Sequence, residues 1–186
     1  MKKLVFMLVA VATTAFSQAA SVYWTCTYVA KSAENYVDNS LAYFVNAATL
    51  SRADALALSG KGATTISATL KDFYSYTGST DGKYSVAKAD AVANATLGLT
   101  DATTDNSAYL IIFDTATITD SSNFYVTEAK SFDTYSGTYS AQIKWGDQET
   151  LSSATGAWNA VNTPEPTSAM LLLLGLCSLA LKRKNA

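Results

Sequence analysis

The sequence predicts a mainly β fold: an antiparallel β-sandwich-like body with one or two short helices, flanked by a signal-peptide helix and a C-terminal hydrophobic helix. Two end segments, 1–19 and 163–186, differ sharply from the rest of the 186 residues and leave one domain's worth of chain at 20–162. All eleven tyrosines lie in that body, with many Thr, Ser, Val and Ile residues, and these types suit pleated, half-buried surfaces. Its short apolar runs are separated by Asp, Ser and Gly turns at intervals compatible with a sandwich.

The first nineteen residues have the organisation of a secretory signal peptide. Residues 1–3 contain two lysines, residues 4–16 are apolar, and small residues follow at Ser17, Ala19 and Ala20. Cleavage after Ala19 fits signal peptidase best because Ser17 and Ala19 are both small, whereas cleavage after Ala20 would place a glutamine at the outer recognition position. We therefore expect signal peptidase to release a mature chain that begins near Ala20.

The first part of the body predicts two strands and one helix. Residues 22–29 alternate apolar or aromatic side chains with small polar ones over part of their length, which indicates a first strand. The apolar run 41–46 predicts a second strand. Ser51 is a plausible helix N-cap with Asp54 three residues later, so a short helix is expected from Ser51 to Leu58.

The next segments predict strands around a turn. Residues 64–70 are rich in β-branched side chains and residues 73–76 are aromatic, so both are expected to be strands. Residues 78–82 begin and end with glycine and predict a tight turn. Residues 83–86 are expected to complete a hairpin across that turn.

The second half of the body centres on its most hydrophobic run, residues 108–113, which predicts a central strand buried on both faces. Before it, residues 87–98 fit either an alanine-rich helix or an irregular connection, and the polar residues 100–107 predict a loop. Four further short strands are expected, at 115–118, 123–128, 138–145 and 156–161.

The charge of the body argues against a nucleic-acid partner. Five of the thirteen basic residues and one of the fifteen acidic residues lie in the end segments, so the body carries eight basic and fourteen acidic residues, a net charge of about −6. A net negative charge repels phosphate backbones, and the body has no basic run. We therefore expect no nucleic-acid binding.

The two cysteines are not expected to pair with each other. Cys26 lies in the predicted first strand, and Cys177 lies inside the hydrophobic tail, on the other side of a membrane boundary. Cys26 is therefore expected to be a buried small residue, the alternative being an intermolecular disulfide.

The chain contains no histidine, which excludes Ser-His-Asp and Cys-His nucleophilic systems and histidine-based zinc sites. Glycoside hydrolysis needs only two carboxylates, and the body has Glu34, Glu128 and Glu149, but no sequence pattern pairs any two of them. We expect no enzymatic activity and no cofactor. A histidine-free hydrolase remains a third interpretation, which would require two carboxylates converging in a cleft at about 5–10 Å.

Two binding patterns are weaker than their structural alternatives. Asp101, Asp105 and Asp114 offer oxygen ligands of the kind Ca²⁺ prefers, but their spacing matches no EF-hand loop, so no metal site is expected. The segment around Trp145, together with Trp158 and exposed tyrosines, has the residue types of a stacking platform for sugar rings, but packing in a sandwich core is favoured.

The last residues form a short hydrophobic segment between prolines and basic residues. The apolar run 169–181 has thirteen residues, and a helix of that length covers roughly 20 Å against about 30 Å of membrane hydrocarbon. Pro164 and Pro166 bias the residue before each of them towards an extended conformation. Basic residues favour the cytoplasmic side of a membrane, so the body is expected on the opposite side. The basic cluster is Lys182, Arg183 and Lys184.

This arrangement resembles the PEP-CTERM sorting tail of bacterial surface and secreted proteins, which has a Pro-Glu-Pro tripeptide, a short hydrophobic helix and a terminal basic cluster. The tripeptide is Pro164, Glu165 and Pro166, and the resemblance covers only residues 163–186. It implies recognition by a membrane-embedded exosortase-type transpeptidase, which removes the tail. It also implies an inner-membrane-anchored precursor that later reaches the cell surface or the extracellular matrix. An ordinary single-span anchor is the alternative.

Two functions from different classes follow. The favoured one is a non-enzymatic structural or adhesive protein, exported and delivered by its sorting tail. The alternative is a carbohydrate-binding module for exopolysaccharide that stacks sugars on aromatic side chains. They differ in whether Trp24, Trp145 or Trp158 is exposed on a flat face or a concave strip.

Overall fold

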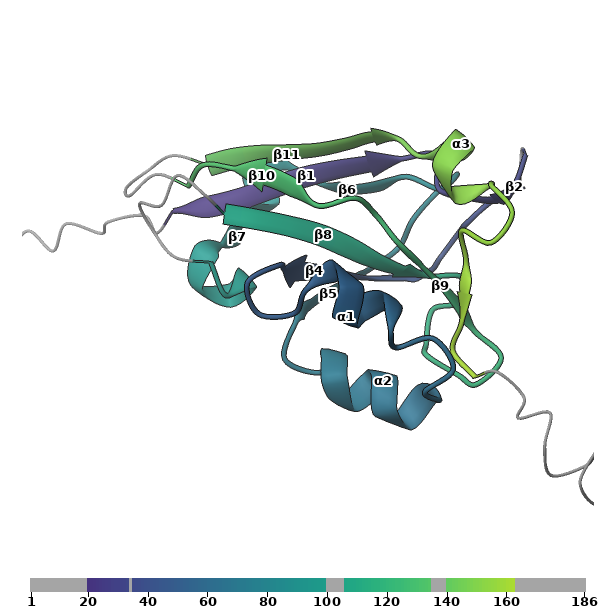
Figure 1. Ribbon diagram of the computed structural model, residues 1–186. Coiled ribbons are helices and arrows are strands. Elements are labelled where there is room, and N and C mark those ends of the chain that lie inside the picture. Colours follow the sequence, from purple (N-terminus) through teal and green to yellow (C-terminus); the bar gives the residue numbers. More distant parts are fainter. Residues whose placement is uncertain (1–19, 34, 100–105, 135–139, 163–186) are drawn as a thin grey trace, which may run out of the picture.

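Two main β-sheets and a pair of helices form three layers in the computed structural model, which describes residues 20–33, 35–99, 106–134 and 140–162 (Figure 1). A separate two-stranded sheet pairs β2 with β3. The helices are α1 (Arg52–Leu56), α2 (Ala63–Leu70) and α3 (Glu149–Ser152), with 3₁₀ turns η1 (Lys88–Asp90) and η2 (Asn94–Leu97). The strands are β1 (Ser21–Thr27), β2 (Ala30–Ser32), β3 (Asn35–Tyr36), β4 (Leu41–Asn46), β5 (Tyr74–Thr77), β6 (Tyr84–Val86), β7 (Val92–Ala93), β8 (Asn106–Phe113), β9 (Asn123–Val126), β10 (Lys130–Phe132), β11 (Ser140–Asp147) and β12 (Asn159–Ala160).

The sheets are largely antiparallel, and the prediction of a mainly β body with few short helices is confirmed. The smaller sheet has the order β11-β1-β6, with β7 also paired to β1. The larger sheet has the order β12-β9-β8-β4-β5, with β10 also paired to β8. The pair β1 and β11 is parallel, joining segments that are far apart in the sequence.

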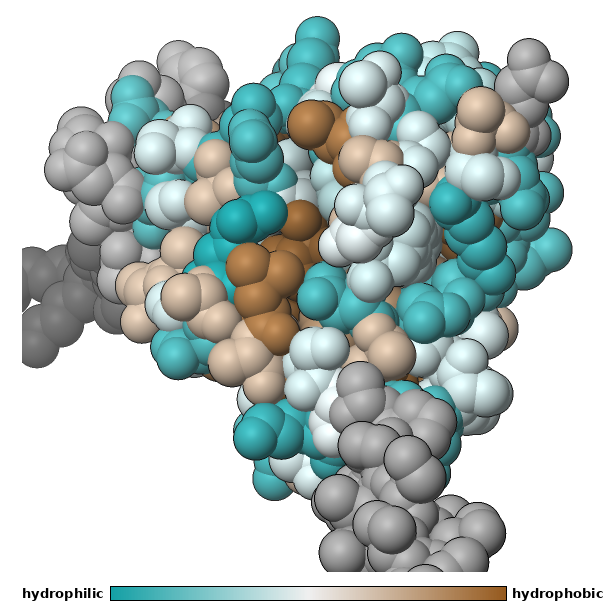
Figure 2. Space-filling view, turned by 45° about the vertical axis from the view of Figure 1, so that its right-hand side comes forward, coloured by the Kyte–Doolittle hydropathy of each residue, from teal (hydrophilic) through white to brown (hydrophobic). Residues whose placement is uncertain are grey.

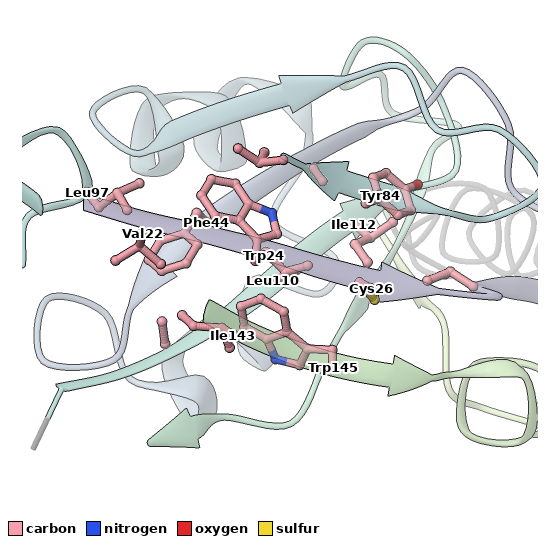
Figure 3. Packing of buried hydrophobic residues seen from close by; sticks show 14 of the residues in the cluster. Val22, Trp24, Cys26, Phe44, Tyr84, Leu97, Leu110, Ile112, Ile143 and Trp145 are labelled. Atoms are coloured by element: carbon pink, nitrogen blue, oxygen red, sulfur yellow. The ribbon is translucent and has the colours of Figure 1, made fainter. Parts of the chain in front are cut away.

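Strand β1 supplies one wall of the core between the sheets. Its burial alternates along its whole length, which is the period of two that the sequence predicts, and Val22, Trp24 and Cys26 point inward. The Trp24 ring lies 4.9 Å from the Phe44 ring, and Trp145 meets Phe44 edge-on with ring centroids 6.2 Å apart (Figure 3). Aromatic residues from β1, β4 and β11 therefore hold the two sheets together.

Strand β8 is the centre of the larger sheet and is buried on both faces, as its sequence predicts. Leu110 and Ile112 face the smaller sheet, while Tyr109 and Ile111 pack with residues of α1 and α2. A strand covered on both sides has no solvated face, which explains its continuous apolar run.

The predicted helix at Ser51–Leu58 is confirmed. Ser51 is the N-cap of α1, and its Oγ accepts a hydrogen bond from the Asp54 amide at 3.1 Å. Ser51 Oγ also donates to Asp54 Oδ2 at 2.6 Å, which closes a local capping arrangement.

Residues 64–70, predicted as a strand, form helix α2 instead. Ile66 and Leu70 are four residues apart and both fully buried, whereas Ala68 between them is exposed. In a strand all three side chains would share one face, but in a helix only Ile66 and Leu70 do. Packing on the sheet therefore outweighs the β propensity of the threonines.

The strands expected at 73–76 and 83–86 form as β5 and β6, but their expected pairing is wrong, and so is the strand expected at 115–118. The predicted hairpin between 73–76 and 83–86 does not form, because β5 pairs with β4 in the larger sheet and β6 pairs with β1 in the smaller one. Residues 115–118 form a loop, in which threonine and serine side chains take the hydrogen bonds that a strand would give to a neighbour. The ambiguous stretch 87–98 contains η1, β7 and η2.

Candidate functional site

The predicted sorting residues lie outside the described residues. What the structure does describe is the two junctions where the body meets its end segments. These undescribed residues are Ala19, Pro164, Glu165, Pro166, Cys177, Lys182, Arg183, Lys184 and the whole run 169–181. Across the ranges that are described, no helix has both the length and the apolar character needed to span a bilayer. Both junctions are ordered parts of the fold.

At the N-terminal junction, Ala20 already belongs to the folded body. It is 2% exposed, and its carbonyl oxygen accepts a hydrogen bond from the Asn94 amide at 2.9 Å. The next residue, Ser21, pairs with both β7 and β11. A cut after Ala19 leaves these contacts in the mature chain, whereas a cut after Ala20 would remove the acceptor of the Asn94 amide.

At the C-terminal junction, the chain is held on both sides up to Val161. Strand β12 pairs with β9, and the Val161 amide donates to the Ser122 carbonyl at 3.0 Å. On the other side, the Gly62 amide donates to the Val161 carbonyl at 2.9 Å. The Val161 side chain is fully buried. In the sequence, Pro164 follows only three residues later.

The loop beside this junction is organised around the buried Ser122 hydroxyl. Ser122 Oγ lies 2.7 Å from Thr115 Oγ1 and 2.9 Å from Thr119 Oγ1, and it accepts from the Thr119 amide at 3.0 Å. The backbone closes the same turn, since the Ser122 amide donates to the Thr119 carbonyl at 3.0 Å. These bonds fix the loop, on which the Thr117 side chain is exposed.

A second contact ties this loop to helix α2. Asp120 Oδ1 accepts a hydrogen bond from the Ala63 amide at 2.8 Å, at the start of the helix. The N-cap residue is Gly62, which has no side chain to cap the helix itself. The turn at residues 59–63 and the loop at residues 115–122 therefore surround the point where the chain leaves the fold, and we call them the exit rim. Figure 1 shows both next to the end of β12.

The stacking-platform interpretation is wrong for two of the three tryptophans. Trp24 and Trp145 are 2% and 3% exposed, and Trp145 Nε1 donates to the Glu128 carbonyl at 2.9 Å. Trp158 is half-buried, donates to the Ala30 carbonyl at 3.0 Å and packs against the Tyr125 ring. On the face in Figure 2, hydrophobic residues form small patches between polar ones.

An aromatic pair with one exposed and one half-buried ring lies elsewhere, at the turn after β1. Tyr28 is 36% exposed, and its ring centroid lies 5.7 Å from that of Tyr36. Lys83 Nζ lies 5.1 Å from the centre of the Tyr28 ring, and Tyr36 Oη donates to Glu149 Oε2 at 3.2 Å. Sequence reasoning missed this pair because Tyr28 lies in the turn after β1 and Tyr36 lies in β3, and no local pattern joins them to Glu149.

The carboxylates of the body that were candidate ligands or catalysts have structural partners or lie apart. Asp114 accepts from the Asn123 amide at 2.8 Å and from its side-chain amide at 3.0 Å, and it pairs with Lys31 at 3.1 Å. Asp101, Asp105 and Glu34 lie outside the described residues. Within the described ranges no cluster of three or more His, Cys, Asp or Glu side chains has the arrangement of a metal site.

Two of the cavities on the described surface are each lined by one carboxylate. The first, of about 300 Å³, contains Asp72 beside Phe73 and three threonines. The second, of about 250 Å³, contains Glu128 beside Arg52. The Arg52 guanidinium is already engaged, because its Nε donates to the Thr127 carbonyl at 2.8 Å. A general acid and base pair requires two converging carboxylates, and neither cavity provides them.

Cys26 is buried in the first strand, as its sequence context predicts. The side chain is fully buried and unpaired among the described residues. Burial raises the pKa of its thiol to about 12, because the thiolate would lose its hydration. The thiol is therefore protonated near neutral pH and points into the core rather than towards another chain.

The arrangement closest to the predicted sorting signal is thus the C-terminal junction, with its fixed end at Val161 and its exit rim. The pair of exposed Tyr28 and half-buried Tyr36 is a separate surface feature. Comparison of the chain with protein-family models, with curated proteins and with solved structures found no match.

Proposed function

We propose that this is an exported bacterial surface or extracellular-matrix protein whose tail is a PEP-CTERM-like sorting signal. The observation that carries the proposal is the order of three parts in one short stretch: the tripeptide 164–166, the apolar run 169–181 and the basic cluster 182–184. Signal peptidase removes the N-terminal segment, and an exosortase-type transpeptidase acts at the tripeptide. The precursor is held at the inner membrane before its release.

The physical role of each part of the tail differs. The apolar run is short for a permanent span, so it serves as a temporary hold on the precursor. The basic cluster keeps the extreme C-terminus on the cytoplasmic side. The two prolines keep the tripeptide extended and free of backbone pairing, which suits insertion into a protease active site.

The body acts structurally or as an adhesive rather than as an enzyme. Support comes from its aromatic residues, because most of those described pack in the core between the sheets, as Trp24 and Trp145 do. Further support comes from Asp114 and Glu149, whose carboxylates are engaged in the protein's own contacts.

The test of the sorting proposal is to replace Pro164, Glu165 and Pro166 with alanines in the native host. We expect the variant to accumulate in the membrane as a precursor that keeps its tail, while the parent chain is processed. A matched control replaces Thr167 and Ser168 with alanines, which leaves the tripeptide intact and should leave processing unchanged. Release of the tripeptide variant at the normal rate would show that the tripeptide is only a linker.

A carbohydrate-binding module is the second candidate, and the Tyr28 and Tyr36 pair is the observation that favours it. Tyrosine combines an apolar ring with a polar hydroxyl and is enriched at binding interfaces, and the Tyr28 ring is exposed. If this function is right, replacing both tyrosines with alanine abolishes retention of the released body on the host exopolysaccharide. If retention is unchanged, this pair is not a sugar site. Tyr76, which lies on β5, serves as the control substitution.

A further inference from the structure

The folded body ends very close to the predicted cleavage signal. Hydrogen bonds from Val161 to Ser122 and from Gly62 to Val161 fix the chain as far as Val161. Pro164 is three residues further along the sequence, and three extended residues span at most about 10 Å. Pro164 therefore lies within about 10 Å of Val161, and Pro166, which is five residues beyond Val161, lies within about 18 Å of it.

An enzyme that binds the tripeptide must come as close to the body as the tripeptide itself. From this geometry we propose that the exit rim, residues 59–63 and 115–122, is a docking surface for the transpeptidase during tail removal. The inference rests on the proposed sorting function and adds to it a contact on the folded body, beyond the tail.

The chemistry of the exit rim suits a polar, weakly charged partner face. The exposed side chains of the loop are mainly small and uncharged, including Ala116, Thr117 and Ser121. Its one carboxylate, Asp120, accepts a hydrogen bond from the Ala63 amide. The turn contributes one exposed cation, Lys61. The hydrogen bonds around Ser122 hold the loop in place before any partner arrives, so little conformational entropy is lost on contact.

The alternative way to reach the tripeptide is to peel β12 from the body. Peeling would break the pairing of β12 with β9 and both backbone hydrogen bonds of Val161, and it would expose a fully buried side chain. Docking needs none of these losses, so we favour docking over peeling of β12.

The test uses the full-length protein in its native membranes and measures the rate of precursor processing by pulse-chase. Ala116 and Thr117 are replaced together, by two lysines in one variant and by two glutamates in the other. Attraction to anionic lipids would change the processing rate in opposite directions in these two variants, whereas a blocked docking surface would slow both. Neither side chain donates or accepts a hydrogen bond within the loop, where Thr117 contributes only its backbone carbonyl. Ala95→Lys and Ala95→Glu, at an exposed position of η2, are the controls.

Each form is also made with a flexible Gly/Ser spacer of about ten residues between Asn162 and Thr163, which moves the tripeptide roughly 17 Å further from the body. At native spacing we expect both rim pairs to slow processing roughly ten-fold, because docking is orientation-dependent, and the Ala95 variants to match the parent. With the spacer, the rim variants and the parent should be processed equally.

Three results would overturn the inference. The first is unchanged processing of both rim pairs at native spacing, and the second is an equal loss with and without the spacer. The third is a spacer that accelerates the parent itself, which would indicate peeling of β12. A parent chain that keeps its tail would refute the sorting function and the docking surface together, whereas the first three results leave the sorting function intact. Thermal unfolding of the purified variants confirms that each one folds.

Discussion

At the scale of single residues, one tight backbone contact in the body depends on a glycine. Gly82 has φ +65°, and a Cβ at this position would lie 2.4 Å from the Val29 carbonyl oxygen. The two segments are bonded to each other, since the Val29 amide donates to the Gly82 carbonyl at 3.0 Å. The chain turns into this contact through Tyr28, which has φ 59° and is therefore itself in the left-handed region.

Gly82→Ala should therefore destabilise the protein by about 3 kcal/mol or more, because backbone atoms must move in addition to the strain of a positive φ. Gly98→Ala is the matched control, since Gly98 has nearly the same φ of +66° with no atom within 4 Å of the added Cβ. We expect the control to cost only about 1 kcal/mol. Urea unfolding of both variants measures the difference, and equal losses would show that the contact with Val29 relaxes easily.

At the scale of elements, the sequence allowed the strands with regular periodicity to be predicted and failed where distant contacts decide the structure. Strand β1 and the central strand β8 were predictable because alternation and continuous hydrophobicity are local signals. Helix α2 was not, because its burial against the sheet and its cap from Asp120 both come from other parts of the chain. The partners of β5 and β6 were missed for the same reason, since no local signal shows that a turn crosses from one sheet to the other.

The same limit applies to the candidate site. The tripeptide and the basic cluster are contiguous in the sequence and are recognised there. The exit rim joins the turn at 59–63 with the loop at 115–122, and only the fold shows that both lie beside Val161.

The helical conformation of residues 63–70 has a direct test. Ala68→Glu should change the free energy of unfolding by less than about 0.5 kcal/mol, because Ala68 is exposed on the helix. Ile66→Ala should cost about 2–4 kcal/mol, because Ile66 is fully buried under the sheet. If the segment were a strand, residues 66 and 68 would share a face, and the glutamate would be the more damaging of the two substitutions.

The cap that Asp120 supplies to α2 should also be measurable. Asp120→Ala removes the acceptor of the Ala63 amide and should cost about 1 kcal/mol. Asp120→Asn keeps an acceptor oxygen in the same place and should recover most of that loss. Chemical denaturation of the three forms decides the point, and an alanine variant as stable as the parent would mean that water replaces the carboxylate.

At the scale of the whole molecule, burial of ionisable side chains predicts unfolding in alkali. Burial raises the pKa of Tyr84 from 10.0 to about 12 and that of Cys26 from 9.0 to about 12. A raised pKa means that the unfolded chain loses these protons first, so stability is full below about pH 9 and falls as the pH rises towards 12. Denaturation midpoints across this range should decline steadily. A midpoint that is independent of pH would show that these groups ionise equally in the folded state.

The two junctions of the body lie at opposite ends of the molecule, where β1 begins and where β12 ends (Figure 1). In a precursor held by its C-terminal tail, the exit rim would face the membrane and the start of β1 would point away from it. Signal peptidase and the tail-processing enzyme would therefore act on separate ends of the same folded body. This orientation follows from the sorting proposal together with the positions of Ala20 and Val161.

The most direct test of the account is the intact mass of the exported protein purified from its native host. We expect a chain that begins at Ala20 and ends close to Pro164, without the apolar run 169–181. Finding Lys182, Arg183 and Lys184 on the exported form, or finding the full-length chain in the cytosol, would contradict it.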